Sequence, residues 1–93
     1  MVEEFSYAKD GDVAERRYIA WTKDHPRSFI INQIGRKIRL HINNGCNHFY
    51  DETTGRCLTG NKKICSDDRQ LLESWAEEYG PTPLQFCRSC KLG

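Results

Sequence analysis

The chain has 93 residues, with 14 Lys and Arg against 13 Asp and Glu, so its formal net charge at pH 7 is +1. This length fits one domain rather than two, and the near-neutral charge excludes a histone-like polycation and an acidic disordered tail. No apolar run approaches the roughly 20 residues that span a membrane. Residues 1–6 lack the apolar segment of a secretory signal, so we expect a cytoplasmic protein.

The N-terminal quarter divides into a lead and a helix. Residues 1–10 are acidic and show no periodicity, so we expect a loose lead before a single domain over residues 11–93. Asp12 is a favourable N-cap, and Glu15 follows it as in a capping box. The helix should end near Asp24, because a proline two residues later disfavours helical backbone before it. Three residues at helical spacing should face the core: Ala14, Tyr18 and Trp21.

A β-hairpin is predicted next. Residues 29–34 are rich in β-branched side chains, and Gly35-Arg36 marks a turn before residues 37–42. In the second arm, apolar and polar residues alternate, as in a half-buried strand. One face carries Ile38, Leu40 and Ile42, and the other carries Lys37, Arg39 and His41.

A long loop and a second helix complete the chain. Residues 43–64 are polar and rich in turn residues, and a loop of this length is typically functional or held by a metal. Ser66 is the expected N-cap of the helix, and Gly80 the residue that ends it. The helix carries a wide apolar stripe: Leu71, Leu72, Trp75, Ala76 and Tyr79. The order of helix, hairpin, loop, helix and zinc knuckle predicts a small α+β domain.

The cysteines indicate a structural metal. An odd number of them without a secretory signal argues against a disulfide framework. The spacing of Cys87 and Cys90 lets two thiolates reach one tetrahedral zinc ion. A redox role for this pair is disfavoured, because no helix follows it. A short chain also has a modest core, which a structural Zn²⁺ would staple. The five cysteines are Cys46, Cys57, Cys65, Cys87 and Cys90.

Three residues compete to complete the zinc site with Cys87 and Cys90. His41 and Cys46 flank a strong turn signal, which would aim both at one point. Cys65 precedes the predicted second helix, whose N-terminal dipole would lower the pKa of its thiol. If no bulge or strand end reorients His41 from the basic face of its strand, Cys65 takes its place. His48 and Cys57 are weaker candidates.

The charge is unevenly distributed. Residues 14–65 carry ten Lys and Arg against four acidic residues, whereas both flanking segments are acidic. A basic hairpin of this kind suits the phosphate backbone of a nucleic acid, although a solvated strand face would also explain it. The candidate phosphate contacts are Arg36, Lys37, Arg39, Lys62 and Lys63. The candidate base-reading residues are Asn32, Gln33, Asn43 and Asn44.

Several segments together resemble a little-characterised bacterial zinc-binding module found in uncharacterised and restriction- or defence-related proteins. The segments are Glu15–Trp21, His25-Pro26, Phe29–Asn32, Leu40-His41, Cys46, Lys63–Ser66, Leu72, Trp75 and Cys87-x-x-Cys90. The resemblance implies that His41, Cys46, Cys65, Cys87 and Cys90 belong to one constellation. It implies no established activity and identifies no partner.

The sequence favours binding over catalysis. Asp24 and His25 offer an acid–histidine pair for a metal-dependent nuclease, but no ββα-metal order follows it. A Cys57 nucleophile with His48 as base lacks an orienting group. An open zinc site would need a general base, for which only Asp51 and Glu52 are near.

Two functions remain in view. The first is a zinc-stabilised nucleic-acid-binding module. It would act as an accessory reader of DNA, including DNA with modified bases. The alternative is a zinc-stabilised protein-interaction module without nucleic-acid binding, using the loop residues Phe49, Tyr50 and Leu58. The oligomeric state is not indicated by the sequence.

Overall fold

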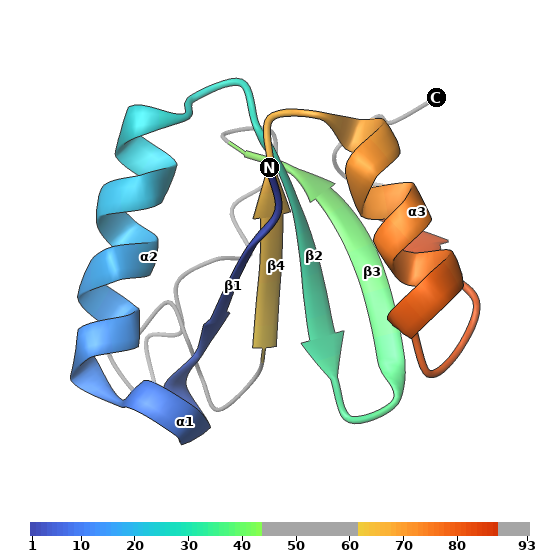
Figure 1. Cartoon of the computed structure of the whole chain (residues 1–93), viewed down its shortest axis with the longest axis horizontal. Helices are drawn as coiled ribbons and strands as arrows, with labels where there is room; N and C mark the ends of the chain where they lie inside the picture. Colours follow the sequence, from blue (N-terminus) through green and yellow to red (C-terminus); the bar gives the residue numbers. More distant parts are fainter. Residues whose placement is uncertain (44–61, 88–93) are drawn as a thin grey trace.

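In the computed structural model, which describes residues 1–43 and 62–87, a five-stranded sheet lies between two helical layers (Figure 1). The strands are β1 (Glu3–Ser6), β2 (Phe29–Ile34), β3 (Lys37–Ile42), β4 (Lys62–Ser66) and β5 (Gln85–Phe86). The helices are α1 (Tyr7–Asp10), α2 (Asp12–Asp24) and α3 (Arg69–Tyr79). The strand order is β1-β4-β2-β3-β5, and only the β3–β5 pair is parallel. The predicted α+β class is confirmed.

The β2–β3 hairpin forms where the sequence predicts it. Ile34 pairs with Lys37, which leaves Gly35 and Arg36 as a two-residue turn. Gly35 adopts φ 59°, a left-handed conformation that side chains disfavour and that tight hairpin turns require. The Lys37–Ile42 alternation is confirmed in part, because Ile38 and Leu40 are fully buried.

Alternation along the central strands creates two cores, one on each face of the sheet. Successive strand residues point to opposite faces, so Ile30 and Ile31 enter different clusters. The cluster under α2 contains Phe5, Ala14, Tyr18, Ile30 and Cys65. The cluster under α3 contains Ile31, Ile38, Leu40, Ile64, Leu72 and Ala76.

Helix α2 matches its predicted length and core face but not its predicted cap. Ala14 and Tyr18 are buried, and Trp21 packs against their cluster. The N-cap is Gly11, with no side-chain capping bond, and Asp12 is already the first helical residue. The predicted capping box at Asp12 is therefore wrong.

The boundary of α3 also differs from the expectation. Residues 62–66, predicted as the end of a loop and a helix cap, form β4, and Ser66 is fully buried at its end. The helix is capped by Asp68, whose carboxylate accepts from the backbone N–H of Gln70 at 2.9 Å. Ser66 in turn holds the capping residue in place, because its Oγ accepts a hydrogen bond from the backbone N–H of Asp68 at 3.0 Å.

Both outer strands fall outside the predicted elements. Residues 1–10, expected as a loose lead, contain β1 and α1, and the buried side chain of Phe5 anchors β1 to the α2 cluster. β1 lies at a sheet edge, where charged residues are common. Because Glu3 and Glu4 occupy half of it, the segment lacks the apolar pattern by which a strand is predicted from sequence. β5 has two residues, too few for a periodic signal.

Candidate functional site

The parallel β3–β5 pair brings one predicted metal ligand beside another. The register pairs Arg39 with Gln85 and Leu40 with Phe86, so Cys87 follows next to His41. The backbone N–H of Cys87 donates to the carbonyl of Leu40 at 2.9 Å, which extends the ladder to this point. His41 and Cys87 are both buried, with 5% and 6% of their surfaces exposed. Neighbouring strands lie about 4.8 Å apart, a separation that one zinc ion can bridge.

Cys65 does not lie near this pair. It is paired with Ile30, which is paired in turn with His41, so three strand spacings separate Cys65 from Cys87. That is about 14 Å, whereas two thiolates on one zinc are at most about 4.6 Å apart. Of the alternatives that the sequence left open, the register therefore favours His41 over Cys65 as the partner of Cys87.

The environment of Cys65 is also opposite to the prediction. Its side chain is fully buried in the apolar cluster under α2. Burial raises the pKa of the Cys65 thiol well above its ordinary value; the positive charge of Lys63 opposes this shift and the negative charge of Glu3 adds to it. The predicted lowering of its pKa by the helix dipole is wrong, because Cys65 lies within β4, before the Asp68 N-cap of α3, and its burial dominates.

The other predicted ligands, Cys46 and Cys90, lie outside the described residues, as do Cys57 and His48. Within residues 1–43 and 62–87, no group of three or more His, Cys, Asp or Glu side chains is placed to hold a metal ion. His41 and Cys87 supply a nitrogen and a sulfur donor, which is the donor chemistry of structural zinc.

The predicted phosphate contacts separate into two groups. Arg36, Lys37 and Arg39 are exposed, and Arg39 shares only a 3.3 Å hydrogen bond with the side chain of Gln85. In the part of the chain that the structure describes, none of these three forms an ion pair. No described acidic residue therefore compensates the positive charge of these three side chains.

The second group is engaged within the fold. Lys62 forms an ion pair with Glu4 at 2.8 Å. Lys63 is only 3% exposed, and its Nζ donates to Oδ1 of Asn32 at 2.8 Å. Lys63 and Asn32 are therefore not placed to contact a nucleic acid. Gln33 is half-buried and donates to the carbonyl of Gly35 at 3.2 Å, so its amide serves the hairpin turn.

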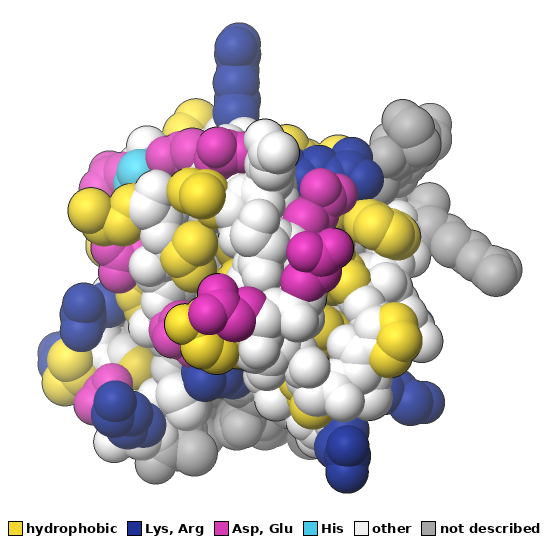
Figure 2. Space-filling view, turned by 45° about the vertical axis from the view of Figure 1, so that its right-hand side comes forward, with side chains coloured by type: hydrophobic (Ala, Val, Ile, Leu, Met, Phe, Trp, Pro, Cys, Tyr) yellow, Lys and Arg dark blue, Asp and Glu magenta, His cyan; other side chains and the backbone are white. Residues whose placement is uncertain are grey.

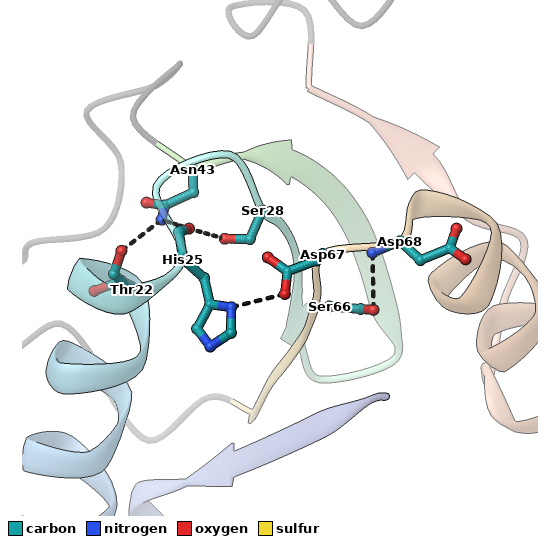
Figure 3. Close-up of polar contacts among 7 residues, drawn as sticks. All are labelled: Thr22, His25, Ser28, Asn43, Ser66, Asp67 and Asp68. Atoms are coloured by element: carbon teal, nitrogen blue, oxygen red, sulfur yellow. Dashed lines mark hydrogen bonds and ion pairs between the residues drawn. The ribbon is translucent and has the colours of Figure 1, made fainter.

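Asn43, predicted as a base-reading residue, is a buried structural residue. Its Nδ2 donates to the carbonyls of Thr22 at 2.9 Å and His25 at 2.8 Å, which ties the end of β3 to the end of α2 (Figure 3). The carbonyl of His25 also accepts from Oγ of Ser28 at 2.6 Å. Asn44, the neighbouring candidate, lies outside the described residues.

This network positions His25 against an acidic residue that sequence reasoning did not pair with it. Nδ1 of His25 lies 2.7 Å from a carboxylate oxygen of Asp67, from the β4–α3 junction (Figure 3). The imidazole ring also stacks on Trp21, with centroids 4.3 Å apart and planes 15° apart. The expected acid–histidine pair involved Asp24 instead. No sequence signal connects positions 42 residues apart, so only the fold reveals this pair.

The contact with Asp67 orients the imidazole ring of His25. A carboxylate on Nδ1 fixes the orientation of an imidazole in triads and metal sites. In the same network the hydroxyl of Ser28 donates to the backbone carbonyl of His25. Among the described residues the pair therefore acts as a tie between the α2 and α3 sides of the sheet.

Within the described residues, no helix is long and apolar enough to cross a membrane. The aromatic loop residues of the alternative function, Phe49, Tyr50 and Leu58, lie outside these ranges. No family model matches the chain, and neither the curated proteins nor the solved structures yield a match to it. The resemblance to a bacterial zinc module therefore stays a prediction, and the function is inferred from the residues and their geometry.

Proposed function

We propose that the protein is a zinc-stapled nucleic-acid-binding module that uses the β2–β3 hairpin. The observation that carries this proposal is the positive charge of Arg36, Lys37 and Arg39, which are all exposed and form no ion pair within residues 1–43 and 62–87. Three cations within four consecutive residues of the hairpin present a charge row that suits successive phosphates. The proposed ligand is DNA. The module would act as an accessory reader of DNA, including DNA with modified bases.

The zinc ion would have a structural role rather than a catalytic one. His41 and Cys87 would hold it together with Cys90, whose spacing from Cys87 suits a zinc knuckle, and with Cys46. His41 and Cys87 lie one residue beyond the Leu40–Phe86 pair of the β3–β5 ladder, and two residues beyond Arg39 and Gln85. Metal bound at that position would fix the edge strand β5 against β3, the strand that carries Arg39.

Binding of a short DNA duplex by the full chain, measured over a range of salt concentrations, tests this proposal. Replacing Lys37 and Arg39 with alanine should weaken binding and reduce the magnitude of the salt slope by about 1.8, or 0.9 per lost phosphate contact. Arg16→Ala with Arg17→Ala is the matched control, because it removes the same charge from exposed positions on α2.

A hairpin double variant with the affinity and salt slope of the parent would contradict the assignment. Equal losses in both double variants would indicate attraction by net charge alone. Failure of the parent to bind DNA or RNA at low salt would end the nucleic-acid proposal.

A further inference from the structure

Ile34, the last residue of β2, is an exposed apolar side chain among the cations of the hairpin. It is 57% exposed and is paired with Lys37. Cross-strand partners share a face of the sheet, and so do alternate residues of one strand, so Ile34 lies on the same face as Lys37 and Arg39. Ile38 and Leu40 point to the opposite face, into the cluster under α3. The exposed face at this end of the hairpin therefore combines one apolar side chain with two cations.

The charge around Ile34 indicates what covers it. An isolated exposed apolar side chain is ordinary at a protein surface, but this one is followed along the turn and β3 by Arg36, Lys37 and Arg39, which form no ion pair with a described residue. Lys and Arg side chains project from the lower edge of the molecule in Figure 2, at the end of the sheet where Figure 1 places the β2–β3 turn. A polyanion is the ligand that this setting attracts.

The shape of a hairpin suits one part of a DNA duplex. The major groove of B-DNA is about 12 Å wide and admits a two-stranded ribbon, whose strands lie about 4.8 Å apart. Cations on such a ribbon contact the phosphates that line the groove, and an apolar side chain beside them meets the edges of the bases. The apolar group that the major groove offers is the C5-methyl of thymine, and 5-methylcytosine carries a methyl at the same ring position.

We infer that Ile34 is a specificity-determining residue that contacts the C5-methyl group of a pyrimidine in duplex DNA. The inference rests on the proposed function and adds to it the chemical group that the hairpin recognises. Thymine and 5-methylcytosine share this group, so either base is a source of the contact. Removing one methyl group from water at Ile34 strengthens binding by about fourfold.

Binding of the full chain to two matched pairs of duplexes tests the inference. Thymine is replaced by deoxyuridine in one pair and 5-methylcytosine by cytosine in the other, so the members of each pair differ only in methyl groups. The methylated member should bind about fourfold more tightly for each methyl contacted, and the pair that shows this preference identifies the base. Ile34→Ala should abolish the preference and keep the salt slope, because it removes no charge. The position is exposed, so this variant should stay folded.

Val13→Ala is the matched control, because it removes a 50% exposed apolar side chain from α2. It should keep the methyl preference of the parent. Equal binding within both pairs of duplexes, or a methyl preference that survives Ile34→Ala, would overturn the inference and leave the proposed function standing. A parent chain that binds none of these duplexes at low salt would overturn the proposed contact with DNA, and the inference with it.

Discussion

Cys65 illustrates at the residue scale how burial decides the chemistry of a thiol. The sequence places it just before a helix, where a thiolate is favoured. In the structure it faces Tyr18 and Ile30 in an apolar cluster, and desolvation raises its pKa. A cysteine that binds a metal must be deprotonated. Because burial keeps the Cys65 thiol protonated, this residue serves as part of the apolar core rather than as a metal ligand.

The raised pKa of Cys65 predicts a loss of stability at alkaline pH. Below an ordinary thiol pKa near 9, Cys65 is protonated in both states and does not change stability with pH. Above it, the unfolded chain releases a proton that the folded chain retains, so the free energy of unfolding falls as pH rises. Between pH 7 and 10 this loss should reach about 1.4 kcal/mol.

Chemical denaturation of the parent and of Cys65→Ala across this pH range would measure the effect. The variant should lack this part of the pH dependence, although the removed side-chain volume lowers its stability at every pH. Parallel pH profiles would show that the thiol ionises as readily in the fold as in the unfolded chain.

At the scale of elements, the end of α3 is fitted closely against the hairpin. Gly80 ends the helix, and its N–H donates to the carbonyl of Ala76 at 3.0 Å. A β-carbon at this position would lie 2.4 Å from that carbonyl oxygen and 2.7 Å from Cδ1 of Ile38. Thr82 then donates from Oγ1 to the carbonyl of Arg36 at 2.6 Å, which joins the chain after α3 to the hairpin turn.

We therefore expect Gly80→Ala to destabilise the protein by about 1–3 kcal/mol, because the backbone or Ile38 must shift. Ser74→Ala on the exposed side of α3 is the control and should change stability by at most about 0.5 kcal/mol. Thermal or urea unfolding measures both. Unchanged stability of Gly80→Ala would mean that the backbone of α3 or the side chain of Ile38 shifts at little cost in free energy.

At the scale of the whole molecule, the proposed zinc ion would act at a weak edge of the sheet. β5 has only two residues and holds to β3 alone within the described sheet. His41 and Cys87 occupy adjacent strands immediately beyond this short ladder. A zinc ion bound by both residues would hold β5 against β3, where only two residue pairs form the ladder.

Cys87→Ser should therefore release zinc and strongly destabilise the fold, because zinc binding and folding are coupled. Cys65→Ala should retain one zinc per chain, despite losing a buried side chain. Metal analysis of both purified full-length variants, alongside the parent, provides the comparison. Full zinc content in Cys87→Ser would refute the metal centre, and loss of zinc from Cys65→Ala would return Cys65 to the ligand set.

Local pattern was sufficient for the elements whose signals are local. The β2–β3 hairpin was predicted to the residue, because a turn glycine and strict alternation specify its register. Helix α2 was predicted to its last residue by the proline that follows. The apolar stripe of α3 and the candidate donors His41 and Cys87 were likewise visible in the sequence.

Only the tertiary structure decided which of these residues meet. The short edge strands β1 and β5 gain their identity from pairing with distant partners, so their own residues carry little signal. The same pairing sets Cys87 beside His41 and away from Cys65, buries Lys63 on Asn32, and joins His25 to Asp67. Composition and spacing determined which chemistry the chain possesses, whereas strand order determined where it lies, because strand order depends on contacts between residues far apart in the sequence.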